Sequence, residues 1–142
     1  MKYPKKRNAE EIQMRLFSTR ASVAKAVETT RAFLTRFGAR NGMEICLIVR
    51  ELLMNAVEHG NKSVPEKSIA YRFGPWGDGQ FRIDIEDEGE GFDYAHLDLT
   101  IPEDPRHAPH RGYPLVNALC ERIEFNKAGN HVSAYMPVRS EN

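Results

Sequence analysis

Residues 42–59 form a segment that is apolar on almost every side, and this segment limits what the chain can fold into. Its apolar residues recur every three or four positions, which predicts a helix. A helix that is apolar almost all round is buried inside a domain rather than exposed on its surface. We therefore expect a folded core around this helix, which ends at His59, with Gly60 in the left-handed conformation of a C-cap.

A narrow polar stripe interrupts this otherwise apolar helix. It consists of Glu51, Asn55, Glu58 and His59. At about 100° per residue, all four fall within about 100° of one another. A solvent-exposed face is usually broader and richer in Lys and Arg. A narrow, acidic stripe flanked by Leu, Ile and Met indicates that these residues line a binding site. The alternative is an ordinary solvent-exposed helix face.

The rest of the chain predicts short strands and two further helices. Strand patterns occupy residues 11–18, 68–73, 80–87, 122–126 and 131–138. One helix is expected from an N-cap at Ser18 or Thr19 to Gly38, and a short one at residues 112–120. Residues 74–79 are expected to form a hairpin turn. This order predicts an α+β fold, a two-layer sandwich whose mostly antiparallel, mixed sheet carries helices on one face.

The length and charge of the chain restrict its class. At 142 residues it has the size of one domain, for which we expect the whole range 1–142. Residues 1–10 are expected to be a basic, flexible tail and residues 93–111 an unusually long loop. Twenty basic and twenty acidic residues cancel, which argues against general binding to nucleic acids or membranes. No signal peptide, membrane span or disulfide pattern is found, so we expect a soluble cytoplasmic protein.

An acid stands on the buried side where the strand at residues 80–87 ends. Phe81, Ile83 and Ile85 alternate with polar residues, and the same period places Asp87 with the apolar set. A buried carboxylate is unfavourable without hydrogen bonds, so Asp87 needs a donor from the protein or from a ligand. Glycines follow it at the spacing D-x-G-x-G and allow close approach of another group to the backbone.

The run RGYP at residues 111–114 is a third candidate motif. Gly112 and Pro114 suit the start of a helix, where free N–H groups can hold a phosphate. The nearby His107 and His110 are spaced for a metal, but no third ligand is close in sequence, so we interpret them as solvated loop residues.

Taken together and in order, E-x-x-x-N-x-x-x-H on a buried helix, D-x-G-x-G-F after a strand and Arg-Gly before a helix resemble the GHKL, or Bergerat-fold, ATPase superfamily. The resemblance covers about residues 12–138 and is strongest to stand-alone anti-sigma-factor serine/threonine protein kinases. It implies a bacterial partner-switching protein that binds a sigma factor or phosphorylates a STAS-domain anti-sigma-factor antagonist. It also implies ATP and Mg²⁺ as cofactors, and a homodimer.

The resemblance implies a role for each candidate residue. Glu51 would be the general base, Asn55 the Mg²⁺ ligand, and His59 would line the phosphate end of the site. Asp87 would accept the exocyclic N–H of adenine, and residues 99–112 would form a lid over ATP. The other implied contacts, beside the base and the phosphates, come from Gly89, Gly91, Arg111 and Gly112.

The third motif departs from the family pattern. Many relatives have Gly-x-Gly where this chain has His110-Arg111-Gly112, so a different lid geometry is expected. This difference supports a second hypothesis, a non-catalytic ATP-binding module that docks a sigma factor or a STAS partner. A third hypothesis is a structural domain that binds no nucleotide.

Overall fold

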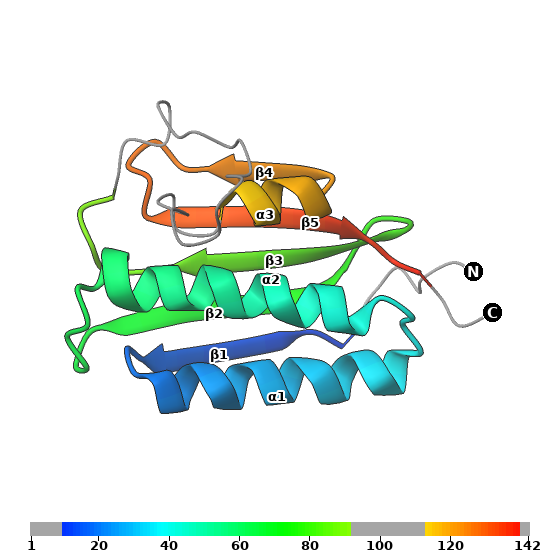
Figure 1. The fold of residues 1–142 in the computed structure, drawn as a ribbon, viewed down its shortest axis with the longest axis horizontal. Helices are drawn as coiled ribbons and strands as arrows, with labels where there is room; N and C mark the ends of the chain where they lie inside the picture. The colour runs from blue at the N-terminus through cyan, green and yellow to red at the C-terminus, as the bar shows by residue number, and fades with distance from the viewer. Residues whose placement is uncertain (1–9, 92–112, 140–142) are drawn as a thin grey trace, which may run out of the picture.

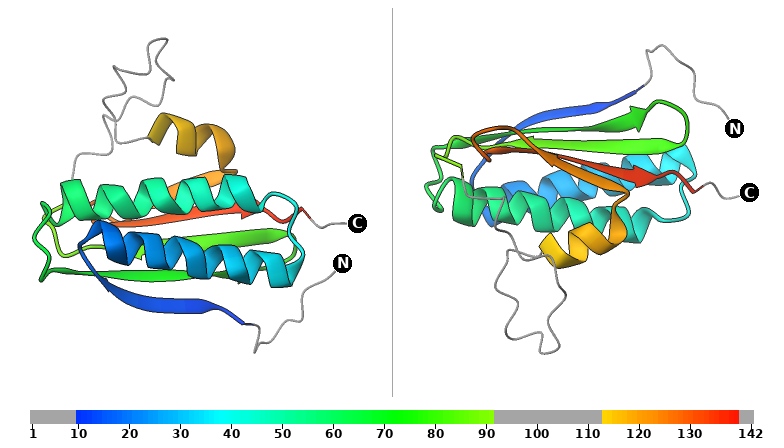
Figure 2. Two further views of the ribbon diagram at one scale, coloured as in Figure 1. Left: turned by 60° about the horizontal axis from the view of Figure 1, so that its bottom comes forward. Right: turned by 90° about the horizontal axis from the view of Figure 1, so that it is seen from above.

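The computed structural model describes residues 10–91 and 113–139. The elements in these ranges are, in chain order, β1 (Ile12–Phe17), α1 (Arg20–Phe37), α2 (Gly42–Asn55), the π-helical turn η1 (Ala56–Gly60), β2 (Ser68–Trp76), β3 (Gln80–Glu86), α3 (Tyr113–Leu119), β4 (Arg122–Phe125) and β5 (His131–Pro137). All three α-helices lie on the same side of the sheet, and α1 and α2 run side by side across it (Figure 1, Figure 2). No helix within the described ranges has the length and apolar character needed to cross a membrane.

The strands form one sheet in the order β1-β2-β3-β5-β4. Each neighbouring pair is antiparallel. The predicted α+β class, with two layers and helices on one face, is therefore confirmed. A mixed sheet was expected, but the described strands form no parallel pair, because the β4–β5 hairpin places β5 beside β3 in the opposite direction.

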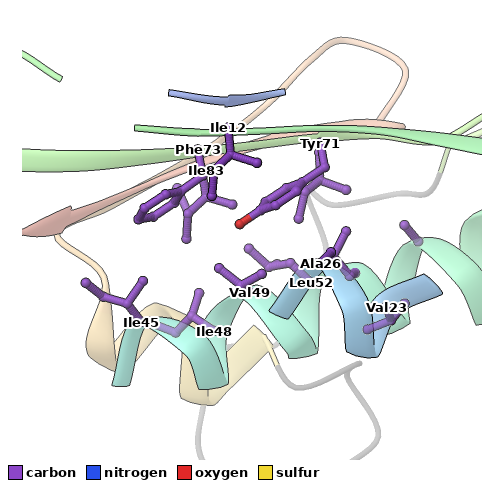
Figure 3. Packing of buried hydrophobic residues seen from close by; sticks show 14 of the residues in the cluster. Ile12, Val23, Ala26, Ile45, Ile48, Val49, Leu52, Tyr71, Phe73 and Ile83 are labelled. Carbon is purple, nitrogen blue, oxygen red and sulfur yellow. The ribbon is translucent and has the colours of Figure 1, made fainter. Parts of the chain in front are cut away.

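The core lies between the sheet and the helix pair. Tyr71, Phe73 and Ile83 point from the sheet toward the helices, where they face side chains such as Val49 and Leu52 (Figure 3). All five are at most 1% exposed. The apolar residues of α2 thus pack against the sheet as the sequence predicted, and this packing holds the helix in place.

Local signals explain where α1 begins and ends. The Thr19 side chain accepts a hydrogen bond from the Ser22 N–H at 3.1 Å, which caps the first turn. Gly38 ends the helix in the left-handed conformation with φ 83°. The β2–β3 turn is shorter than predicted, because β2 continues to Trp76, whose ring lies 4.2 Å from the Arg82 guanidinium on β3.

Candidate functional site

Helix α2 stops being α-helical at Asn55, earlier than predicted. The next residues form one π-helical turn, which the Asn61 N–H closes by donating to the Ala56 carbonyl at 2.8 Å. Each residue of a π-turn advances by a smaller angle than in an α-helix, so the angles predicted for Glu58 and His59 do not hold. Both of these side chains are exposed.

The predicted left-handed conformation at Gly60 was wrong. Positive φ occurs instead at Lys62 (54°) and Ser63 (58°). Gly60 is required for a different reason: a Cβ atom at this position would overlap the carboxylate of Asp87. The glycine therefore allows the end of the helical segment to contact the acid at the end of β3.

A methyl group at Gly60 tests this contact. Gly60→Ala should lower the free energy of unfolding by about 1–3 kcal/mol, because the added Cβ forces the Asp87 loop away. Gly42→Ala is a matched control at the other end of α2, where the new Cβ would lie 3.7 Å from the Leu34 Cβ, an ordinary contact. Thermal denaturation of both variants measures the difference. Equal stabilities would contradict the assigned role of Gly60.

Asp87 is held in place by backbone groups on both sides. Its N–H donates to the Asn130 carbonyl at 3.0 Å, and its Oδ1 accepts the Gly89 N–H at 2.8 Å. The hydrogen-bond donor expected for the Asp87 carboxylate is thus supplied in part by the Gly89 N–H of the same loop. The half-buried carboxylate also lines a pocket, so it can accept a hydrogen bond from a ligand there.

The two glycines after Asp87 allow close backbone contacts. A Cβ at Gly89 would overlap the Gly60 carbonyl, and a Cβ at Gly91, where φ is 91°, would overlap the carbonyl of Ala128. The first contact joins the Asp87 loop to the π-turn and the second joins it to the β4–β5 turn. Glycine at both positions therefore lets the Asp87 loop pack closely against the other two segments.

The pocket is open to solvent and is formed by three segments at one end of the molecule. They lie within residues 52–60, 85–91 and 125–132. In Figure 1 this is the left end, where α2 and β3 finish and β5 begins. The candidate acid Asp87 and the candidate amide Asn55 line the same pocket although they come from different motifs.

The structure brings together only part of the predicted set. Asn55, Asp87 and Gly91 line the pocket, whereas Glu51, His59 and Gly89 are not among its described lining residues. Glu51 lies one helical turn before Asn55 and is half-buried. The predicted contacts of Arg111 and Gly112, and the predicted lid, lie outside the described residues.

The donor set near the pocket suits a metal only in combination with a ligand. Within the described ranges, no three His, Cys, Asp or Glu side chains gather as a protein metal site would need. Asn55 is buried, and its amide oxygen is of the hard type that Mg²⁺ accepts. Mg²⁺ commonly takes one or two protein ligands and completes its shell with phosphates and water, so Asn55 fits that mode.

The β4–β5 turn forms a wall of the pocket that was not predicted from the sequence. Residues 129 and 130 line the pocket, and the turn is held by the Asn126 Oδ1, which accepts the N–H groups of Gly129, Asn130 and His131 at 2.7, 3.0 and 3.2 Å. The run KAGN predicted a turn, and the Asn and Gly residues gave a local signal for it. No local signal shows that this turn faces Asp87.

Comparisons with known proteins agree with this geometry. A family model described as histidine kinase-like ATPase domain matches residues 16–136. The fold is similar to the crystal structure of the RsbU and RsbW domains of Rv1364c from Mycobacterium tuberculosis, with a TM-score of 0.60 and 19% sequence identity. That match covers 94% of this chain and 34% of the other, so this chain spans about a third of its length. No curated protein matches the sequence.

Proposed function

Because the chain belongs to the histidine kinase-like ATPase domain family, we propose that it is an ATP- and Mg²⁺-dependent serine/threonine protein kinase of the anti-sigma type. Its partner is a STAS-domain anti-sigma-factor antagonist, which it phosphorylates, or a sigma factor, which it binds. The observation that carries the proposal is the pocket in which Asp87 and Asn55 meet. The likeness to a chain with an RsbW domain supports the partner-switching part.

The pocket fits adenine in its chemistry. Asp87 is an acceptor held on a fixed loop, and an amino group such as the one on adenine is a suitable donor to it. Guanine carries a carbonyl at the corresponding position and would face the carboxylate with an acceptor. Gly60 and Gly91 keep the walls free of side chains. These features support ATP as the nucleotide.

The phosphate end would lie toward the last turn of α2. Asn55 would hold Mg²⁺ through its amide oxygen, and the ion would neutralise charge on the phosphates. Arg111 and Gly112, beyond the described residues, would contact the phosphates, and His59 would lie near them. Glu51 belongs to the regular part of α2, so its side chain follows the same face as Asn55.

In the proposed reaction, Glu51 accepts the proton of a serine or threonine hydroxyl on the partner. The hydroxyl oxygen then forms a bond to the γ-phosphorus of ATP, and the bond from that phosphorus to the β–γ bridging oxygen breaks. ADP leaves with the bonding electron pair. The protein contributes position and charge rather than a covalent intermediate, as is usual in phosphoryl transfer.

The direct test is transfer of labelled γ-phosphate. The purified chain is incubated with ATP, Mg²⁺ and each STAS-domain protein of the same organism, and label on serine or threonine is expected in one of them. If label reaches none of these proteins, the kinase assignment is wrong.

His110 in place of a family glycine favours a second candidate, a nucleotide-binding module without chemistry. A single-turnover experiment with bound ATP separates the two functions. A kinase converts bound ATP to ADP when the partner is added, whereas the module leaves the γ-phosphate in place.

A further inference from the structure

Asn61 is a fully buried polar residue that the proposed reaction does not use. It directly follows Gly60, and its side chain makes three hydrogen bonds. The Nδ2 group donates to the Ser18 Oγ at 2.8 Å and to the Ser68 carbonyl at 3.0 Å, and the Oδ1 atom accepts the Glu88 N–H at 2.8 Å. The Asn61 side chain itself is 0% exposed, the bond to Ser18 is buried and the other two are partly buried, so losing them is costly.

These bonds join segments that are far apart in the sequence. Ser18 follows β1, Ser68 begins β2, and Glu88 lies in the loop after β3. The backbone N–H of Asn61 also closes the π-turn through the Ala56 carbonyl. One residue therefore connects the end of the helix that carries Asn55 with the loop that carries Asp87.

The hydrogen bond from Glu88 to Asn61 acts close to the pocket, because Glu88 is the chain neighbour of the lining residue Asp87. Glu88 stands between Asp87 and Gly89, and both neighbours contact Gly60, the residue before Asn61. The Asn61–Glu88 bond thus runs alongside two close contacts between the same pair of segments. Of the three side-chain bonds of Asn61, it is the one that joins the end of the π-turn directly to the Asp87 loop.

The side chain of Glu88 makes a second, solvent-exposed connection between the same loop and the start of β2. The Glu88 Oε2 atom accepts the Ser68 N–H at 2.6 Å and the Ser68 hydroxyl at 2.8 Å. These hydrogen bonds hold the pKa of Glu88 below its ordinary value. Glu88 is therefore charged at neutral pH, and its loop is tied to the start of β2 as well as to Asn61.

We propose that Asn61 is a positioning residue for the nucleotide site. It holds the Asp87 loop against the end of the π-turn, so that the base-binding acid and the metal-binding amide keep one relative position. The inference rests on the proposed function insofar as Asp87 receives the adenine. It adds a specificity role to a residue outside the three recognised motifs.

The test compares two buried asparagines. Asn41 is 7% exposed and donates to the Pro137 carbonyl at 2.9 Å, at the opposite end of α2 from the pocket. Asn61→Ala and Asn41→Ala should both lower the melting temperature. Only Asn61→Ala should weaken ADP binding, by about tenfold, measured by calorimetry at a temperature where all variants are folded.

Base selectivity separates positioning from general destabilisation. Inosine diphosphate carries a carbonyl in place of the 6-amino group of adenine, so it gains little from a well-placed Asp87. Asn61→Ala should therefore weaken ADP much more than inosine diphosphate, measured by competition. Glu88→Ala, an exposed change that leaves the core intact, should shift the same ratio in the same direction, whereas the exposed Glu90→Ala should not.

The outcomes are distinguishable. If the wild-type chain binds no ADP, the proposed function fails together with its site. If the wild-type chain binds ADP but Asn61→Ala and Glu88→Ala keep its affinity and selectivity, only the positioning role is overturned. Equal losses in Asn61→Ala and Asn41→Ala would likewise overturn it, since they would show a purely structural effect.

Discussion

Glu51→Gln should slow phosphoryl transfer to the partner by about a thousandfold, the range expected when a general base is removed. The amide has nearly the shape of the carboxylate but cannot accept the hydroxyl proton. Nucleotide affinity should stay close to the wild-type value, because Glu51 is not among the described residues lining the pocket. Single-turnover transfer of labelled γ-phosphate measures the rate, and calorimetry with ADP measures the affinity.

Glu44→Gln is the matched control for this experiment. Glu44 is an exposed acid on the first turn of the same helix, away from the pocket. It should transfer phosphate at the wild-type rate. A Glu51→Gln variant as fast as Glu44→Gln would show that the proton goes to another acceptor, and the base would have to be sought elsewhere.

Asp87→Asn should lower ATP affinity by about tenfold to a hundredfold, which corresponds to losing one hydrogen bond to a charged acceptor. The amide keeps one acceptor oxygen, which can still bind the Gly89 N–H, but its other end becomes a donor. A donor in the pocket opposes the amino group of adenine. Calorimetry with ATP and with inosine triphosphate measures the effect, and the preference for adenine should shrink.

Asp84→Asn provides the comparison on the same strand. Asp84 lies on the outer face of the sheet, where it accepts hydrogen bonds from the Ser133 hydroxyl at 2.5 Å and contacts the His131 ring at 3.2 Å. Its loss should reduce stability without changing ATP affinity. Unchanged affinity in Asp87→Asn would show that Asp87 does not contact adenine, whereas a wild-type chain that binds no ATP would favour the hypothesis of a structural domain without nucleotide.

The regular elements could be predicted because their signals are local. The alternation of apolar and polar residues predicted the bounds of β1 and β3 to within one residue. The capping residues Thr19 and Gly38 predicted both ends of α1, because each acts on the adjacent helical turn. The end of β2 was missed because Gly74 and Pro75 are turn formers in isolation. In the sheet they face Arg82 and Phe81 of β3, and that pairing outweighs their local preference.

The end of α2 could not be predicted, because the cause lies in another part of the chain. A glycine after a helix usually adopts the left-handed conformation, and nothing near Gly60 argued against it. The Asp87 carboxylate and the Asn61 side-chain bonds arise only when β3 is in place. The π-turn is the geometry that satisfies these distant contacts.

The candidate site also contains residues that local motifs predicted and a residue that they did not. Three motifs read in order predicted the GHKL superfamily, and the match to the histidine kinase-like ATPase domain confirms it. Kinase activity and the roles of Glu51, Asn55 and Asp87 stay predictions. The role of Asn61 could not be predicted because its partners lie 43, 7 and 27 positions away, in segments that come together only in the folded sheet.

The pocket combines segments from residue 52 to residue 132, and this has a consequence for how the protein folds in the cell. During synthesis, helices α1 to α3 and strands β1 to β3 leave the ribosome before the β4–β5 turn, which is the last wall of the pocket. Nucleotide can stabilise only a chain that already has that wall, because ligands favour the states that bind them. ATP levels should therefore affect the lifetime of the finished protein and leave the folding of the growing chain unchanged.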